Sequence, residues 1–494
     1  MRIPFPERIP IARVGLFAIA LFAVQWFEGT PLYFRLGSAV FILIAAFAFN
    51  TAGGLTRASG VYVFFYSTLV VIVGLCYKAF LGEPGQSNLL DPRTTIYVYV
   101  GGISAMFAAV IVSRRFRRKT GLLQNVLKES QMYRASIGCI LFGLYGGLII
   151  SVLGESSFRL ETAFTQLNLL IPLGIIIGVM YEIRRSGGTR SINLPIVLAG
   201  ALYFWGWGLH SFSKQGMLLP LVCWFFPVCA LRFRLSALQA LACLAGAFLV
   251  FYYLVPYAQY GRSQVDETMT EDQKNAVSYK LLEHPEQTRQ TYNEIEATSA
   301  GAVGEYFDKP QGFWDRLQFI SLDDAIINAT DQGKVFGLLP IKAEMLNAIP
   351  HVFWPDKPTY NFGNVYAHQA GLSVSEEDTT TGISFSPTAE AYHMAKWVGV
   401  LVLAPLIWFV LFVVYDSLFG DLRATPWGLL VIAMFSHFAP EGMLTGVIAQ
   451  LTFGTEALVF CALFAAWVAP VLASTVLGPK RRGVAPRISF QPAP

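Results

Sequence analysis

The sequence is short of charge, cysteine and recognisable catalytic motifs. Only 14% of its 494 residues are Asp, Glu, Lys or Arg, whereas 54% are hydrophobic. No phosphate-binding glycine loop, HExxH or GxSxG motif occurs, and nothing indicates an ATP-driven pump. The six cysteines all lie in apolar stretches, which argues against a disulfide-bonded ectodomain and a thiolate metal site. They are Cys76, Cys139, Cys223, Cys229, Cys243 and Cys461.

What the chain has instead is long apolar segments, and its mean hydropathy is +0.50. This composition predicts an all-α integral membrane protein with many spans. Each segment approaches the ~20 residues needed to cross ~30 Å of hydrocarbon. About twelve transmembrane helices are expected, near residues 11–27, 35–50, 60–80, 96–113, 135–153, 168–183, 191–210, 215–232, 235–256, 396–415, 424–439 and 457–477. Residues 440–456 are compatible with a re-entrant or interfacial segment.

The basic residues predict how these spans are oriented. Clusters at 114–119, 184–185, 232–234 and 480–482 fall on the side of the two termini. That side holds 21 Lys and Arg, against 6 in the short segments of the far side. By the positive-inside rule both termini are expected to be cytoplasmic. The chain then divides into a first membrane bundle (1–256), a long extracytoplasmic loop (257–395), three last spans (396–477) and a cytoplasmic tail (478–494).

The long loop is acidic, with 20 Asp and Glu against 9 Lys and Arg, whereas the rest of the chain is basic. Because the basic residues flank apolar segments, no nucleic-acid partner is indicated. Residues 268–297 are polar and have a helical composition, which is compatible with a surface helix or with partial disorder. Aromatic residues recur from 304 onwards, which favours packing of this later half on the membrane face of the bundle.

The most unusual stretch of the loop runs from Ala348 to Pro358. Its three prolines forbid a regular helix and fix several backbone angles. Between them lie His351, Trp354 and Lys357. Such a stiff segment can hold polar groups beside an apolar surface, although a surface turn with buried aromatics explains the same residue types.

Cations at the predicted outer ends of the spans are candidates for binding an anionic lipid. Lys214 lies in a very short turn between two spans, Arg262 follows the ninth span, and Arg316 follows Trp314 and Asp315. An arginine can clamp a phosphate with two donors. The alternative interpretations are that Lys214 snorkels to lipid headgroups, that Arg262 anchors the helix at the membrane interface, and that Arg316 forms a local salt bridge.

Two groups that accept protons lie where the loop enters the tenth span. A helix that begins at Pro387 places Glu390 and His393 three residues apart, on one face. Such a pair can act as a general base, and helix capping is the alternative. Asp323 and Asp324 are the nearest approach to a paired-carboxylate metal motif, but adjacent acids at a helix start more often cap it or face solvent. We therefore expect no metal and no cofactor.

The stretch from Ile349 to Pro358 resembles the iPRxxWPdKP signature of bacterial oligosaccharide repeat-unit polymerases, the Wzy-type O-antigen polymerases. Asp315-Arg316-Leu317 is similar to the family's loop arginine, and the run from Thr381 to Tyr392 resembles its segment that enters a span. The Ser213-Lys214 turn is similar to an arginine-bearing turn in the wider group, which includes the O-antigen ligases. His351 and Lys214 stand where the family has arginine, and both differences remove a bidentate phosphate donor.

This resemblance implies a helical membrane enzyme similar to the C-type glycosyltransferases. Its reaction would transfer a growing glycan from undecaprenyl pyrophosphate to an incoming lipid-linked repeat unit, at the periplasmic face of the bacterial inner membrane. Fixed cations would stabilise the departing pyrophosphate without a metal. The implied substrate-binding residues are Lys214, Arg262, Arg316, Lys357 and Trp354, and the candidate bases are Glu390, His393 and His351.

The implied partners are undecaprenyl-pyrophosphate-linked oligosaccharides and membrane lipids, together with a flippase and a chain-length regulator. Three other classes stay open. A ligase-like enzyme would share the helices and the loop, whereas the WPDKP run favours the polymerase. A flippase or transporter would need ionisable groups at mid-membrane depth, where His437 is the main candidate. A non-catalytic assembly scaffold is the third.

Overall fold

A computed structural model describes residues 1–153, 166–265, 269–298, 303–349, 354, 357–358, 360–372, 377–378 and 381–478. The described residues form helices and no β-strand, apart from a single bridge between Arg2 and Arg234. His351 lies outside the described residues, and so does the side chain of Arg316.

Six helices of the described part are long and apolar enough to cross a membrane. They are Leu32–Ala52, Ala58–Leu81, Pro92–Phe116, Ala237–Ser263, Pro387–Ala424 and Met443–Leu477. Three shorter apolar helices accompany them, at Ile11–Phe27, Leu194–His210 and Lys214–Ala230. The chain is thus a multi-pass helical membrane protein, while the count of twelve spans and the sidedness of the loop stay predictions.

Local sequence signals fix several of these helix ends. Helix α5 (Pro92–Phe116) begins with proline in its first turn, and the Asp91 side chain accepts a hydrogen bond from the Thr94 amide at 3.1 Å. Helix α2 (Leu32–Ala52) ends at Gly53, whose φ of 110° suits glycine. Helix α11 (Ala237–Leu249) begins with a capping box formed by Ser236 and Gln239.

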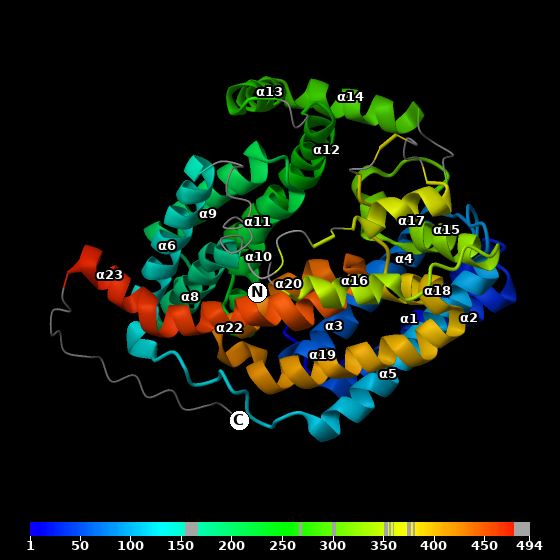
Figure 1. Cartoon of the computed structure of the whole chain (residues 1–494), viewed down its shortest axis with the longest axis horizontal. Coiled ribbons are helices and arrows are strands. Elements are labelled where there is room, and N and C mark those ends of the chain that lie inside the picture. Colours follow the sequence, from blue (N-terminus) through cyan, green and yellow to red (C-terminus); the bar gives the residue numbers. More distant parts are fainter. Residues whose placement is uncertain are drawn as a thin grey trace.

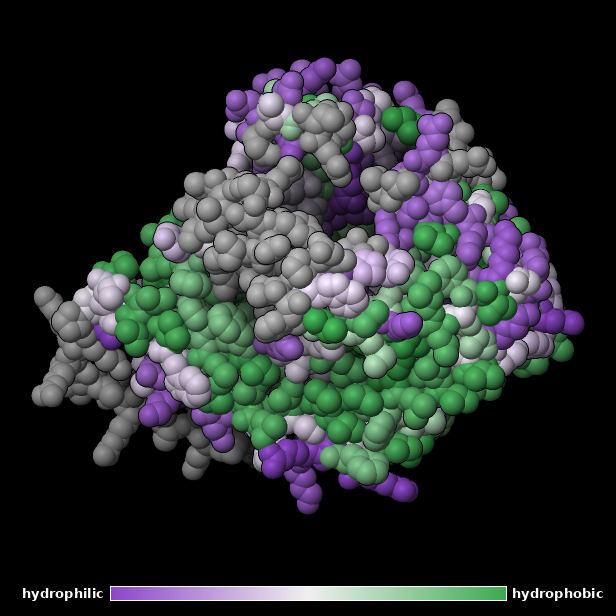
Figure 2. All heavy atoms as spheres, in the orientation of Figure 1, coloured by the Kyte–Doolittle hydropathy of each residue, from purple (hydrophilic) through white to green (hydrophobic). Residues whose placement is uncertain are grey.

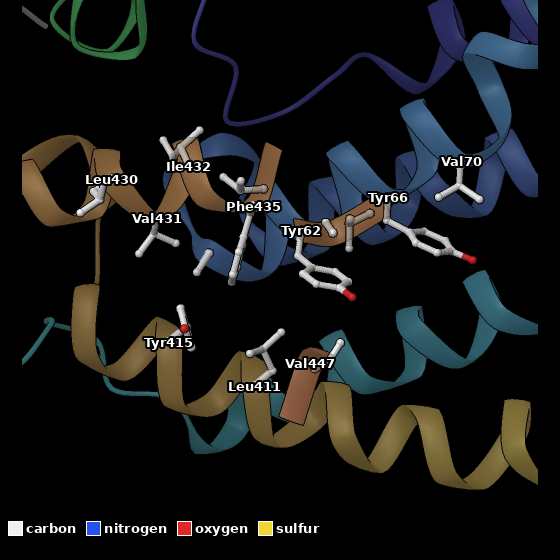
Figure 3. Close-up of a cluster of buried hydrophobic side chains, with 14 of the residues drawn as sticks. Tyr62, Tyr66, Val70, Leu411, Tyr415, Leu430, Val431, Ile432, Phe435 and Val447 are labelled. Carbon is white, nitrogen blue, oxygen red and sulfur yellow. The ribbon is translucent and has the colours of Figure 1, made fainter. Parts of the chain in front are cut away.

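The core of the membrane bundle forms around α3 (Ala58–Ser67), α19 (Ala404–Phe419) and α20 (Pro426–Glu441). Tyr62 of α3 is fully enclosed, and its ring meets the ring of Phe435 edge-on at 5.5 Å (Figure 3). Edge-to-face pairs of this kind add to the free energy gained by burying the rings. They favour one mutual placement of these helices.

An ion pair whose carboxylate is buried closes the bundle on the side predicted to be cytoplasmic. Arg117 contacts Asp416 at 2.8 Å and also donates to the carbonyl of Ala52 at 2.9 Å. The backbone and hydroxyl of Ser59 donate to the same carboxylate. Because every oxygen of Asp416 is engaged, the ends of α2, α3, α5 and α19 are tied together.

The polar segments gather toward the other side of the molecule. In Figure 1 the helices α13 (Glu271–Glu283) and α14 (Pro285–Thr298) lie above the bundle, joined to it through α12 (Val255–Ser263). Helices α13 and α14 confirm the helical alternative for most of residues 268–297. Figure 2 shows hydrophilic side chains on these helices and around α17 (Phe362–Ala370), over an apolar band that covers α19 and α22 (Thr455–Leu463).

Two expectations change in the structure. Residues 443–477 form one continuous helical run beginning with α21 (Met443–Ala449), so most of the 440–456 segment belongs to a long helix. Asp323 and Asp324 of α15 (Ile320–Asp331) are 0% and 1% exposed, so the interpretation of a solvated pair is wrong. Both carboxylates instead bind groups on neighbouring helices, which offsets the cost of burying them.

Candidate functional site

The first candidate cation, Arg262, lies in the last turn of α12, which continues the helix that starts at Ala237. Its guanidinium donates to the carbonyl of Phe212 at 3.1 Å. Phe212 forms the tight turn before α10 (Lys214–Ala230), with a φ of 47°. A Cβ on Gly261 would lie 2.1 Å from the Phe212 ring, so this close approach requires glycine.

The Lys214 turn is held against α12 by further contacts. Tyr257 donates to the carbonyl of Leu209 at 3.0 Å, and its ring lies 5.1 Å from that of Phe212. The hydroxyl of Ser213 caps α10 by accepting from the Gly216 amide at 3.1 Å. Lys214 is the first residue of α10 and is half-buried. The structure thus brings Lys214 and Arg262, which are 48 positions apart, to the two sides of one turn.

The segment that carries Arg316 is the 3₁₀ helix Gly312–Leu317, which lies between two membrane helices. Trp314 stacks on Tyr77 of α4 (Val73–Leu81), with ring centres 4.6 Å apart. Phe313 contacts Phe251 with ring centres 4.0 Å apart, on the helix that continues into α12. The backbone of the Arg316 segment is therefore anchored beside the helix that bears Arg262.

The helix expected at Pro387 is present as α18 (Pro387–Val398), and Ser386 caps it. Glu390 on this helix is 1% exposed. Its carboxylate accepts from the Thr445 amide at 2.8 Å, from the Thr445 hydroxyl at 3.0 Å, and from the Tyr366 hydroxyl at 3.1 Å. Glu390 therefore joins α18 to α17 and to α21, in addition to any chemical role.

His393 lies on the same face of α18 and has no exposed surface. Its Nδ1 is 2.8 Å from the hydroxyl of Thr330, and its Nε2 is 2.8 Å from the side-chain oxygen of Gln369. The ring of Tyr366 lies 4.9 Å from the imidazole. Both ring nitrogens are therefore engaged, Nδ1 with a residue of α15 and Nε2 with a residue of α17.

Directly after this pair, α18 is broken. Ala395 and Lys396 leave helical geometry, and Lys396 adopts φ 47° and ψ −135°. The carbonyl of His393, which the break leaves without a helical partner, accepts a hydrogen bond from the Phe336 amide of the loop at 3.0 Å. Lys396 pairs with Asp331 at 3.4 Å. Strained backbone of this kind concentrates at functional sites, and sequence patterns gave no signal for it.

In the signature stretch, the structure describes the residues Ile349, Trp354, Lys357 and Pro358. Lys357 is 8% exposed, and its ammonium donates to the carbonyls of Asn347 at 2.8 Å and Ile349 at 2.9 Å. It thereby caps the C-terminal end of α16 (Leu339–Asn347), and burial lowers its pKa from the ordinary value. Trp354 is half-buried. A substrate-binding role for Lys357 stays a prediction, and it has to coexist with this cap.

The buried acids of α15 form a second polar centre that sequence reasoning missed. Asp323 accepts from the Ser386 amide at 2.9 Å and from the Tyr99 hydroxyl at 2.7 Å. Asp324 accepts from the Thr95 hydroxyl at 2.7 Å and from the Asp91 amide at 3.1 Å. Burial raises the pKa of Asp323 to about 7 and that of Asp324 to about 6. These two carboxyls attach the loop to α5 and to the start of α18.

The candidate residues therefore form two groups. The cations Lys214 and Arg262 lie beside α12, whereas Glu390 and His393 lie where α18 meets α15 and α17 (Figure 1). In the same orientation, Figure 2 shows the surface hollowed between these two parts. A substrate that contacts both groups has to lie across this hollow.

These features define a class: an all-helical, multi-pass membrane protein whose polar helices are docked on the ends of its spans. Comparison of the chain with protein-family models, with curated proteins and with solved structures gave no match in any of the three.

Proposed function

We propose that the protein is a polysaccharide polymerase. It would transfer a growing glycan from undecaprenyl pyrophosphate to an incoming lipid-linked repeat unit. The observation that carries the proposal is the WPDKP stretch in the one long polar segment of a multi-span chain. It is supported by the hydrogen bond from Arg262 to Phe212, which places this cation beside the turn that carries Lys214. The resemblance described above gives the reaction its chemistry.

In this proposal the cations act on the leaving group. As the bond from the sugar to pyrophosphate breaks, negative charge develops on the phosphate oxygens. Arg262 and Lys214, which lie on the two sides of one turn, are proposed to stabilise that charge, with Arg316 on the neighbouring segment. Fixed donors of this kind act without reorganising during the reaction. No metal ion is needed for this step.

Glu390 and His393 are the proposed proton acceptors for the attacking hydroxyl, with His351 as the remaining candidate. Tyr366 and Gln369 of α17 cover the two described groups. We therefore propose that α17 moves away from α18 when the acceptor binds. If α17 stays in place, Glu390 and His393 can only position the helices.

The proposed location is the bacterial cytoplasmic membrane, with both termini in the cytoplasm and the loop in the periplasm. A reporter fused after Lys119 should then be cytoplasmic, and one inserted near Ser375 should be outside, because the basic clusters favour the inner side. A cytoplasmic reporter at Ser375 would remove the basis for an outward-facing site. A flippase and a chain-length regulator are the proposed protein partners.

Deletion of the gene, followed by sizing of the surface glycan, tests the function. A polymerase deletion leaves single repeat units and removes the long ladder. Long chains that persist on the lipid carrier would indicate a ligase instead, and units that accumulate on the inner face would indicate a flippase. A normal ladder in a strain with no second copy of the gene contradicts the proposal.

A further inference from the structure

An apolar groove of about 560 Å³ runs between α2 and the first turns of α5. Leu36 and Val40 of α2 and Tyr97 of α5 line it. Both helices are long and apolar enough to cross a membrane, so the groove opens toward the hydrocarbon. Its volume lies in the range of ~300–1,000 Å³ that is typical of small-molecule sites.

The groove exists because α2 carries a glycine where it meets α5. A Cβ on Gly37 would lie 2.5 Å from Cγ1 of Ile96, so the two backbones can approach only without a side chain there. The larger neighbours on each side, Leu36 and Tyr97, remain 49% and 45% exposed. They form the walls of a furrow whose floor is Gly37.

A cation stands at the mouth of this groove. Arg93 lies in the first turn of α5 and is exposed, and its guanidinium is 5.1 Å from the centre of the Tyr33 ring. Among the described residues Arg93 takes part in no ion pair, whereas the nearby Asp91 is engaged as the cap of α5. A guanidinium beside tyrosines at the end of two spans is suited to binding the phosphate of a lipid at the membrane interface.

The depth of the groove indicates the kind of chain that fits. From Leu32 to Val40 the helix rises ~12 Å, at ~1.5 Å per residue. One leaflet of the hydrocarbon core is ~15 Å thick, half of the ~30 Å bilayer. The groove thus matches an acyl chain confined to one leaflet. A carrier chain that crosses both leaflets would extend beyond it.

We propose that this groove binds one anionic phospholipid, with its phosphate on Arg93 and an acyl chain between α2 and α5. The site does not depend on the catalytic role proposed above. It has a structural consequence, because the first turns of α5 hold the loop through Asp324, which accepts from Thr95 and from the Asp91 amide. A lipid bound beside these turns stabilises the attachment of α15.

The test is native mass spectrometry of the full-length protein released from detergent, with added phosphatidylglycerol or phosphatidylethanolamine. We expect one phosphatidylglycerol to be retained by the wild type, and its retention to fall by roughly tenfold in Arg93→Ala, about 1.4 kcal/mol. Val40→Trp, which fills the groove, should have the same effect. Phosphatidylglycerol should also raise the melting temperature of the wild type and not of these two variants.

The controls use matched positions away from the groove. Val112→Trp changes a similarly exposed valine on α5, and Lys309→Ala removes an exposed cation from the loop. Both should retain the lipid as the wild type does. If Val40→Trp lowers the melting temperature without lipid, Leu36→Trp replaces it. Equal retention in wild type and Arg93→Ala, or retention of polyprenyl phosphate in place of phosphatidylglycerol, overturns the proposal.

Discussion

The guanidinium of Arg262 and the carbonyl of Phe212 are joined by a hydrogen bond of 3.1 Å, across 50 positions of sequence. This bond places one cation beside the turn that carries another, Lys214. It uses one of the five guanidinium donors, so the remaining donors can face a phosphate. The first prediction concerns this relationship.

Arg262→Ala is expected to abolish detectable polymer while the protein still inserts and accumulates. Losing one fixed donor to a developing oxyanion typically costs ~2.7–4 kcal/mol, or roughly 10²–10³-fold in rate. Arg262→Lys should restore activity only in part, because a point charge replaces a planar fork. Glycan length on gels and protein level on immunoblots are the two measurements.

Lys214→Arg is the matched control for this turn and should be tolerated, since arginine is the residue that the proposed polymerase resemblance implies there. If Arg262→Ala and Lys214→Ala both make normal polymer, these cations only anchor the turn at the membrane interface.

A second prediction concerns Glu390. Glu390→Gln keeps the size of the side chain but directs an amide N–H₂ toward donors from Thr445 or Tyr366. A buried group left without its partner costs about 1–3 kcal/mol, so the melting temperature should fall and polymer should be lost. Tyr366→Phe removes one donor and leaves the carboxylate in place. Tyr366→Phe should therefore lower the melting temperature and reduce the polymer less than Glu390→Gln does.

His393→Ala separates the two candidate bases. If Glu390→Gln makes near-normal polymer while His393→Ala makes none, the proton acceptor is His393. If the two variants lose polymer only in proportion to their loss of stability, α18 serves to position the loop.

The third prediction is a pH dependence of stability. Burial holds the pKa of Asp323 at about 7, above its ordinary value of 3.8, so the folded protein binds a proton there that the unfolded chain releases. The stability contributed by this proton is complete below pH 3.8 and is lost as the pH rises toward 7. Asp323→Asn should therefore flatten the decline in melting temperature between about pH 4 and 7.

Asp324, with a pKa of about 6, contributes to the lower part of the same range. The change in melting temperature between pH 6 and 7 is thus the more specific test of Asp323. Asp272→Asn replaces an exposed acid of α13 and should keep the wild-type profile. Identical profiles for wild type and Asp323→Asn would show that the carboxyl does not titrate in this window.

Lys357 gives a fourth prediction. Lys357→Met keeps the apolar stem and removes the ammonium that caps α16, leaving the carbonyls of Asn347 and Ile349 without this donor. A hydrogen bond to a charged group contributes about 1.5–3 kcal/mol, so proteolysis within 339–357 should become faster. Lys342→Met, at an exposed lysine of the same helix, should not change it. Unchanged proteolysis of Lys357→Met contradicts the capping role.

The strained Lys396 supports a fifth prediction. Lys396→Gly relieves the cost of a positive φ, about 1–3 kcal/mol, and loses an ion pair that contributes at most about 1 kcal/mol. The melting temperature should rise. Lys396→Ala keeps the strain and loses the pair, so its melting temperature should fall. A lower melting temperature in Lys396→Gly would mean that the break is held by the lysine itself.

Much of this architecture was determined by local sequence. Apolar segments predicted the six helices that are long and apolar enough to cross a membrane, because length and hydropathy decide whether a helix can cross the hydrocarbon. The count of twelve spans stays a prediction. The start of α18 at Pro387 was also local, since Ser386 caps it and proline suits the first turn. The placement of Glu390 and His393 on one face followed from helical spacing.

The partners of these residues were decided only by tertiary structure. Glu390 meets Thr445, 55 positions away, and Asp323 meets Ser386 and Tyr99 on two other elements. No spacing rule predicts such pairs, because they depend on which helices pack together. From sequence, the adjacent acids of α15 were expected to cap the helix or to face solvent. In the structure they pack against α5 and α18 and join the loop to both. A carboxyl removed from water must accept hydrogen bonds from neighbouring groups.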